Sequence, residues 1–187
     1  MRPLRIIALD LSLTGTGIAA THTRLGEPRL WCTTVAPRRR PSETAIDHGR
    51  LHEIITRITI LAAMQPDLVV IERPLQRSGQ GETSIRLAEL HGAIKHWLWC
   101  RQIKYVDVNL AKVKTYATGN GGAKKHEVQA AVTATYGRLL HISTDDEADA
   151  VTLLAMALDA HGQALAEVPD SHRRALAGIV WPALAVA

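Results

Sequence analysis

The sequence predicts an α/β fold built on a five-stranded mixed sheet with helices on its faces. Three short apolar segments come first along the chain, with no helical pattern between them, and two further segments then alternate with helical stretches. Strands joined by tight turns pair in antiparallel fashion, whereas strands separated by a helix pair in parallel. We therefore expect three antiparallel strands followed by parallel strands.

The five strand candidates are short runs rich in apolar and β-branched residues. They cover residues 4–13, 18–21, 29–35, 67–71 and 103–108. The first two runs are joined by a turn that contains Gly15 and Gly17, which predicts a hairpin. The fourth run, DLVVI, has an unbroken apolar stretch typical of a strand covered on both faces, and Glu72 follows it directly.

The helix candidates are stretches in which apolar residues recur every three or four positions. They run from Ser42 to before Pro66, over 83–100, about 109–116, about 124–136 and 145–160. Thr144 with Glu147 three residues later has the form of a capping box, so Thr144 is the expected N-cap of the last helix. We expect one domain at 1–160 and a tail at 161–187, which could be an appended helix, an interface element or a disordered end.

Length and composition fit a single domain, because 187 residues with 47% hydrophobic content can bury a sizeable core. No apolar run approaches the ~20 residues of a bilayer span, and Asp10 interrupts the N-terminal apolar stretch where a signal peptide would continue. The two cysteines, Cys32 and Cys100, are too few for a disulfide framework. We therefore expect a soluble, cytoplasmic protein with no membrane partner.

The charge balance favours a polyanionic partner. Lys and Arg total 22 against 18 Asp and Glu, which gives a net charge of +4 and a pI near 9.3. Aromatic residues make up only 4% of the chain, and Phe is absent. This composition argues against proteins that bind single strands or RNA by stacking bases on aromatic side chains.

Four acidic residues stand where a charge is costly unless something compensates it. Asp10 and Glu72 each end an apolar strand candidate, and each could instead begin a turn or lie in solvent. Asp146 and Asp149 lie three residues apart on one face of the last helix. The helix dipole accounts for acids in a first turn, but Asp149 lies one turn deeper, among apolar neighbours.

If the first and fourth strands are neighbours, these four carboxylates can meet at one edge of the sheet. Carboxylates that close repel one another unless cations lie between them, and four negative charges match two divalent ions. Oxygen ligands without His or Cys favour Mg²⁺ or Mn²⁺ over Zn²⁺. Two such ions per active site clamp the attacking and leaving oxygens of a phosphoryl displacement. The residues therefore predict metal-dependent phosphodiester hydrolysis.

Four segments resemble the RuvC family of Holliday-junction resolvases, in the ribonuclease H-like (retroviral integrase) superfamily. They are IALDLSLTGTGIA, DLVVIERP, KVKTYATGNGGAKKHEVQAAV and TDDEADAVTLLAMAL, and the likeness covers about 4–160. The resemblance implies a ribonuclease H-like fold and a crossover junction endodeoxyribonuclease, active in DNA recombination and repair, that nicks four-way junctions in pairs as a homodimer. It also implies that the catalytic metal ligands are Asp10, Glu72, Asp146 and Asp149.

The chain departs from the cellular members of that family after the first aspartate. Those enzymes commonly have Pro-Gly there, whereas this chain has Leu11-Ser12, which is closer to divergent or phage-type members. The departure widens the expected substrate range to other branched DNA.

Several basic residues are candidates for DNA contact. By the resemblance, Lys114 and Lys125 fall where the family has basic residues near the cut, although Lys114 alone could be a solvated charge. Lys124 and Lys125 begin a helix after a glycine-containing loop, a combination that can hold a phosphate. Arg73 and Arg77 follow Glu72 and would reach the same groove, and the cluster 38–40 is either a second phosphate contact or a solvated loop.

The same sequence features admit other interpretations besides a nuclease. The motif DLSLTGTG is similar to the phosphate loop of actin-like sugar kinases, but those need two such domains and this chain is too short. A catalytically silent nucleic-acid-binding relative, and a related nuclease acting on other branched DNA or on RNA, stay open. In the stretch 83–100, the apolar residues fit either a dimer interface or a core face; they are Leu87, Leu90, Ile94, Trp97 and Leu98.

Overall fold

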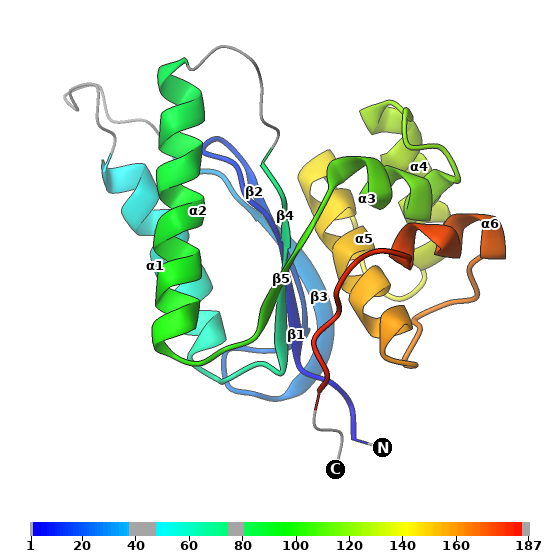
Figure 1. Cartoon of the computed structure of the whole chain (residues 1–187), viewed down its shortest axis with the longest axis horizontal. Helices are drawn as coiled ribbons and strands as arrows, with labels where there is room; N and C mark the ends of the chain where they lie inside the picture. The colour runs from blue at the N-terminus through cyan, green and yellow to red at the C-terminus, as the bar shows by residue number, and fades with distance from the viewer. Residues whose placement is uncertain (1, 38–47, 75–80, 185–187) are drawn as a thin grey trace.

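The computed structural model describes residues 2–37, 48–74 and 81–184, which form a five-stranded sheet with helices on both faces (Figure 1). The strands are β1 Ile6–Asp10, β2 Thr16–His22, β3 Pro28–Val35, β4 Leu68–Glu72 and β5 Tyr105–Val108. Their order in the sheet is β3-β2-β1-β4-β5. β2 pairs antiparallel with β1 and β3, whereas β4 pairs parallel with β1 and β5. The predicted fold class is confirmed, and the first and fourth strands are neighbours, which was the condition for the strand-end carboxylates to meet.

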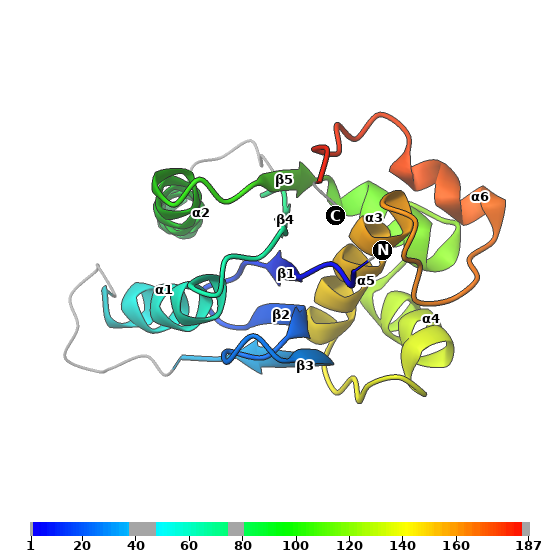
Figure 2. The same cartoon turned by 90° about the horizontal axis from the view of Figure 1, so that it is seen from below.

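The helices lie in two layers, with α1 and α2 on one face of the sheet and α3, α4 and α5 on the other (Figure 2). They are α1 His48–Ala62, α2 Glu82–Cys100, α3 Leu110–Thr118, α4 Lys125–Tyr136, α5 Asp145–Ala160 and the short α6 Asp170–Arg173. The first predicted helix is confirmed from His48 onward, and its expected beginning at 42–47 lies outside the described residues. No helix in the described part of the chain is long and apolar enough to cross a membrane.

The two faces of the sheet each bury a hydrophobic core. Because successive side chains of a strand point to opposite faces, Ile6 and Ala8 of β1 pack with α3, α4 and α5, whereas Ile7 and Leu9 pack with α1 and α2. Helix α5 lies between the sheet and the outer helices and is buried continuously from Glu147 to Asp159. This central position explains its almost unbroken apolar sequence.

Helix α2 turns its apolar stripe toward the sheet. Leu90, Ile94 and Leu98 are buried in the core, and Leu87 and Trp97 pack partly buried against it. Of the two interpretations of this stripe, the core face is therefore the one that the fold uses.

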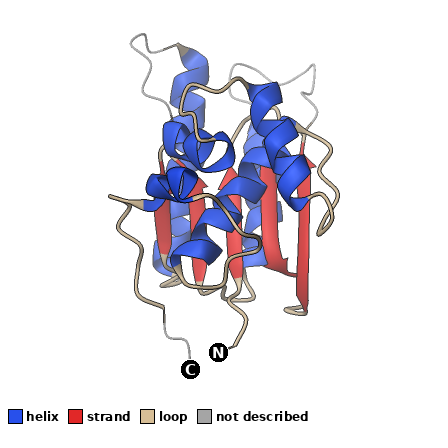
Figure 3. Cartoon of the chain, turned by 90° about the vertical axis from the view of Figure 1, so that its right-hand side faces the viewer, coloured by secondary structure: helices blue, strands red, loops and turns tan. Residues whose placement is uncertain are grey.

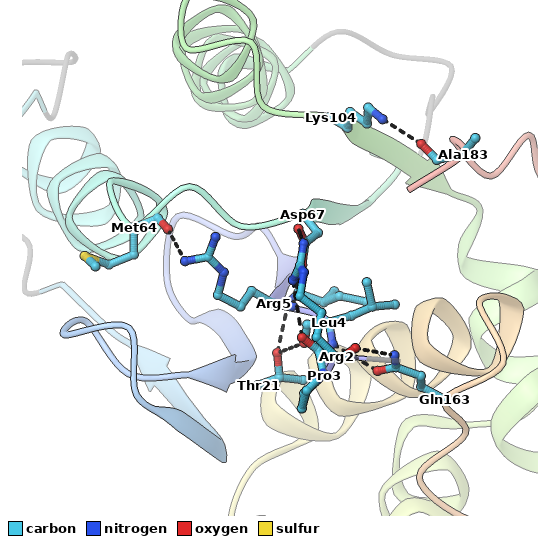
Figure 4. A network of polar contacts seen from close by, with 11 residues as sticks. Arg2, Pro3, Leu4, Arg5, Thr21, Met64, Asp67, Lys104, Gln163 and Ala183 are labelled. Atoms are coloured by element: carbon cyan, nitrogen blue, oxygen red, sulfur yellow. Dashed lines mark hydrogen bonds and ion pairs between the residues drawn. The ribbon is translucent and has the colours of Figure 1, made fainter. Parts of the chain in front are cut away.

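The segment before β1 is tied to distant parts of the chain (Figure 4). The guanidinium of Arg2 donates two hydrogen bonds to the carboxylate of Asp67, at 2.8 and 2.6 Å. Gln163, which follows α5, accepts a hydrogen bond from the backbone N–H of Leu4 and donates one to the carbonyl of Arg2, both at 2.9 Å. These contacts hold the start of β1 between the α1–β4 connection and the end of α5.

The described part of the tail, 161–184, packs against α3 and includes α6. Arg173 forms an ion pair with Asp159 of α5 at 2.9 Å, and the hydroxyl of Tyr116 in α3 donates to the same carboxylate at 3.0 Å. Lys112 of α3 donates to the backbone carbonyl of Ala175 at 3.3 Å. Figure 3 shows this helical layer in front of the strands. Within the described part of the tail, Asp170–Arg173 form a short helix, in line with one of the three alternatives left open for it.

Candidate active site

Asp10 and Glu72 lie side by side at the carboxyl ends of β1 and β4. The two strands are parallel neighbours whose register pairs Leu9 with Ile71, so the next residue of each strand projects at the same edge of the sheet. Both carboxylates are half-buried. The expectation that residues more than sixty positions apart meet at this edge is confirmed.

The N-terminus of α5 lies at the same end of the sheet, shown uppermost in Figure 1. Thr144 is its N-cap, since the Thr144 hydroxyl accepts a hydrogen bond from the backbone N–H of Glu147 at 3.1 Å. The Glu147 carboxylate caps the backbone N–H of Ser143, at 2.6 Å, and not that of Thr144 as a full capping box requires. A hydrogen bond of 2.7 Å between the hydroxyls of Thr34 and Thr144 attaches this end of α5 to β3.

Two glycines let α5 approach the sheet closely enough to bring Asp146 to Asp10. Gly17 of β2 pairs with Asp10 across the sheet, and a Cβ atom at Gly17 would overlap the backbone carbonyl of Asp146. A Cβ atom at Gly15 would overlap the Asp146 carboxylate itself. A side chain at Gly17 would therefore force the helix away from the strand ends, whereas one at Gly15 would displace the Asp146 carboxylate.

The four predicted site carboxylates are electrostatic neighbours. Burial, with the nearby charges of Asp149 and Asp146, raises the pKa of Asp10 to about 7. Burial and the charges of Asp10 and Asp149 raise the pKa of Glu72 to about 9. For Asp149, burial is the largest cause and the pKa rises to about 6. Burial, followed by the charge of Asp145, also raises the pKa of Asp146.

Two of the predicted lysines stand close enough to counter this charge. Lys125, at the start of α4, forms an ion pair of 2.7 Å with Asp145, and its charge opposes the raised pKa of Asp10, Glu72 and Asp149. Lys114 of α3 donates to the backbone carbonyl of Ala123 at 2.7 Å, and its charge lowers the pKa of Glu72 and Asp149. Lys114 is therefore part of the charged surroundings of the site.

Of the remaining predicted basic residues, two are exposed and the others lie outside the described residues. Lys124 is exposed at the N-cap of α4, where its backbone N–H donates to Glu127 at 2.6 Å. Arg73 is exposed directly after β4. Arg77 and the basic cluster at 38–40 lie outside the described residues.

The donor set has the chemistry that Mg²⁺ or Mn²⁺ requires. All four groups offer carboxylate oxygens, and Oε2 of Glu72 is buried with no hydrogen-bond partner among the described residues. Yet, within the described ranges, no three His, Cys, Asp or Glu side chains stand in an arrangement that could hold a metal ion. Uptake of an ion therefore requires these carboxylates to turn toward one another.

The raised pKa values predict that, without divalent cations, stability falls as the pH rises above 6.5. An acid with a higher pKa in the folded than in the unfolded state binds protons more tightly when folded, so the free energy of unfolding decreases as the pH rises between the two values. For Asp10 and Glu72 that range ends at about 7 and about 9. The lowered pKa of His22 and of His91 acts in the opposite direction, but only at the lower end of this range, where unfolded-state histidines with a pKa of 6.5 lose their protons. We expect the Tm in a chelator to drop by roughly 5 °C between pH 6.5 and 8.5, measured by circular dichroism.

Adding millimolar Mg²⁺ at pH 8.5 should restore that Tm, because the cation replaces the protons that the carboxylates lose. The double variant Asp10→Asn/Glu72→Gln supplies the control, with a flat Tm across this range and no response to Mg²⁺. An equal pH dependence in the variant and the unmodified protein would contradict the explanation.

Some features of the site were absent from the sequence prediction. The ion pair of Lys125 with Asp145 was not expected, and neither was the close approach of α5 to Gly17. His91 of α2 is 4% exposed and lines a cavity with Asp10 and Glu72. Its position between Leu87 and Ile94 on the apolar stripe of the helix was a usable signal, because a polar residue on such a stripe is buried with it.

Comparison with known proteins places the chain in a family. A family model described as Crossover junction endodeoxyribonuclease RuvC matches residues 6–160. The chain belongs to the RuvC family. A RuvC-family relative from Gloeobacter violaceus, named Crossover junction endodeoxyribonuclease RuvC, is 33% identical over 95 residues, which are 51% of this chain and 54% of that relative. The chain therefore spans about half the length of the curated relative it matches.

Two solved structures share the RuvC fold with this chain. RuvC of Thermus thermophilus superimposes with a TM-score of 0.61 at 20% identity, covering 89% of this chain and all of that one. The same organism's RuvC in complex with a Holliday junction substrate gives a TM-score of 0.61 at 23% identity over the same share of this chain. At these identities the likeness is one of fold.

Proposed function

We propose that this RuvC-family protein is a metal-dependent crossover junction endodeoxyribonuclease, which hydrolyses phosphodiesters in four-way DNA junctions by paired, symmetric nicks. The observation that carries the proposal is that burial and mutual repulsion raise the pKa values of Asp10 and Glu72 at one end of the sheet, with Asp146 and Asp149 close enough to contribute. Buried acidic groups of this kind are costly for stability alone and are useful to a nuclease. They also favour an enzyme over a catalytically silent DNA-binding relative.

In the proposed reaction, the oxygen of a water attacks phosphorus and the bond from phosphorus to one sugar oxygen breaks. Two divalent ions, Mg²⁺ or Mn²⁺, held by the four carboxylates, would supply charge stabilisation and a more acidic water. The carboxylates of Asp10 and Glu72 come from a rigid strand pair, and those of Asp146 and Asp149 come from a buried helix. This rigid support limits how far the ligands can drift during the reaction.

The basic residues around the carboxylates would hold the DNA backbone. Lys114 and Lys125 lie within electrostatic reach of the site, and Lys124 and Arg73 are exposed beside it. We propose that these four, with Arg77, contact phosphates near the cut. Contacts of this kind contribute affinity without reading sequence.

We further propose that residues 1–160 form the nuclease domain and that residues 161–187 are an appended tail. The family match ends at residue 160, and the described tail packs against α3. Paired nicks need two active sites, so we also propose a homodimer. The outward face of α2, which carries the exposed Ile85 and Trp99, is our candidate for its interface.

The experiment that tests this function compares labelled substrates with and without Mg²⁺. We expect the protein to nick a four-way junction at symmetric positions at least tenfold faster than a linear duplex, and only with the metal. Flap and RNA substrates measure how broad its range is, and light scattering of the same preparation should give the mass of a dimer. Equal cleavage of duplex and junction would overturn the proposal, and so would a junction left intact at every Mg²⁺ concentration.

A further inference from the structure

A cavity of about 240 Å³ opens directly beside the two strand-end carboxylates. Asp10 and Glu72 line it from the sheet, and Ser84, Leu87 and His91 line it from α2. The proposed reaction takes place at Asp10 and Glu72, so any group in this cavity lies next to the reacting phosphate. A group that occupies this cavity would therefore come from the part of the substrate that flanks the cut.

Two residues that line the cavity each carry a buried polar atom with no hydrogen-bond partner in the described part of the chain. One atom is Nδ1 of His91, whose residue is 4% exposed, and the other is Oε2 of Glu72. Buried polar atoms are nearly always paired, so an unpaired one needs an explanation such as a missing ligand. An ion at the carboxylates would satisfy Glu72 and would leave His91 still without a partner.

The chemistry of the lining favours a neutral, flat occupant. A phosphate would be repelled by the two carboxylates on one side of the cavity. A nucleobase carries no charge, presents apolar faces that fit Leu11 and Leu87, and has an edge of donors and acceptors. Burial lowers the pKa of His91 to about 4, so its ring is neutral at neutral pH and offers one donor and one acceptor nitrogen.

We propose that this cavity receives the nucleobase adjacent to the cut phosphate, and that His91 and Ser84 hydrogen-bond its edge and so make cleavage depend on that base. The inference rests on the proposed nuclease function, because it takes the position of the cut from Asp10 and Glu72. His91 and Ser84 act here as specificity-determining residues and not as metal ligands.

Two measurements on the full-length protein test this inference. In the first, four-way junctions that differ at a single nucleotide beside the cut are cleaved in Mg²⁺, and the rates for the four bases are compared. We expect the unmodified protein to distinguish the best and worst base by at least about tenfold. His91→Asn and Ser84→Ala should narrow that ratio to about threefold or less.

In the second measurement, 2-aminopurine replaces the base beside the cut, and its fluorescence is followed as protein is added without divalent ions. A base that leaves the helical stack for the cavity should change in fluorescence several-fold. Ser84→Tyr fills the cavity from an exposed position and should remove this change even at saturating protein. His52→Tyr, which places the same ring on the exposed face of α1, is the matched control and should behave as the unmodified protein.

The outcomes separate this inference from the proposed function. Cleavage whose base dependence is the same in all variants, or that has no base dependence, overturns the cavity assignment and leaves the nuclease standing. An aminopurine signal that Ser84→Tyr removes, in a protein that cleaves no junction, supports a base-binding cavity but overturns the nuclease and, with it, the dependence of cleavage on that base. An aminopurine signal that persists in Ser84→Tyr overturns the cavity assignment in either case. A Tm within about 2 °C of the unmodified protein shows that each variant is folded.

Discussion

Asp10→Asn should lower the rate of junction nicking by roughly 10³-fold, with little change in junction binding. A metal ion supplies several kcal/mol of charge stabilisation in such a reaction, and each ~1.4 kcal/mol is a factor of ten in rate. The amide of Asn keeps the shape of the side chain but loses the charge that neutralises the ion. The lysines that would hold phosphate are unchanged, so the dissociation constant measured without divalent ions should stay within about threefold.

The same variant should be at least as stable as the unmodified protein in a chelator. Burial and the charges of Asp149 and Asp146 raise the pKa of Asp10, so an ionised Asp10 is unfavourable to the fold. Removing that charge relieves the repulsion, and we expect the Tm to rise by about 2 to 4 °C at pH 8. This combination of lost activity and gained stability distinguishes a functional carboxylate from a structural one.

Asp146→Asn should also abolish nicking, and Asp170→Asn serves as the matched control. Asp170 is exposed at the start of α6, so its replacement removes the same charge away from the site and should leave the nicking rate within about twofold. Magnesium-dependent nicking by Asp10→Asn at the unmodified rate would contradict the proposed role of the carboxylates.

Gly17→Ala should both destabilise the protein and impair nicking. The added methyl group would overlap the backbone carbonyl of Asp146, and a backbone atom cannot turn aside as a flexible side chain can. Overpacking of this kind costs about 3 kcal/mol, which corresponds to a fall in Tm of roughly 6 to 12 °C. Molecules that fold must move α5 away from β2, and a shift of ~1 Å in Asp146 should cost about 10²-fold in rate.

Gly81→Ala is the control for the loss of a glycine. Gly81 has an extended backbone with φ of −76°, and a Cβ atom there meets nothing within 4 Å. We expect its Tm to stay within about 2 °C and its nicking rate within about twofold of the unmodified protein. Equal Tm and nicking rates for Gly17→Ala and the unmodified protein would show that the close approach of α5 is not required.

Much of the framework followed from local patterns along the chain. The apolar run DLVVI forms a buried strand paired in parallel on both sides, as its own composition predicts. The Thr144 hydroxyl can accept a hydrogen bond from the backbone N–H of Glu147 because the two residues are close in the chain. The parallel pairing of β1 and β4 could be expected from the order of the elements. That pairing brings Asp10 and Glu72 together, so the core of the candidate site was predictable.

Local patterns do not decide which surface of one helix or strand packs against which surface of another. The stripe of α2 fits a core and an interface equally well in sequence, because both bury apolar side chains, and only the packing of Leu90 and Ile94 on the sheet decides between them. For a similar reason, the capping-box pattern does not fix the partner of the Glu147 side chain. The backbone N–H of Ser143 and that of Thr144 are both within its reach, and the three-dimensional path of the preceding loop selects Ser143.

The sequence by itself determined the elements, their order and the four acidic residues, since these depend on periodicity and on neighbours in the chain. Only the tertiary structure decided that Gly17 makes room for Asp146, that Lys125 pairs with Asp145, and that His91 lines a cavity beside Asp10. Each of these is a contact between segments far apart in sequence. Such contacts depend on distances of a few ångströms between packed elements, and no pattern along a single segment carries that information.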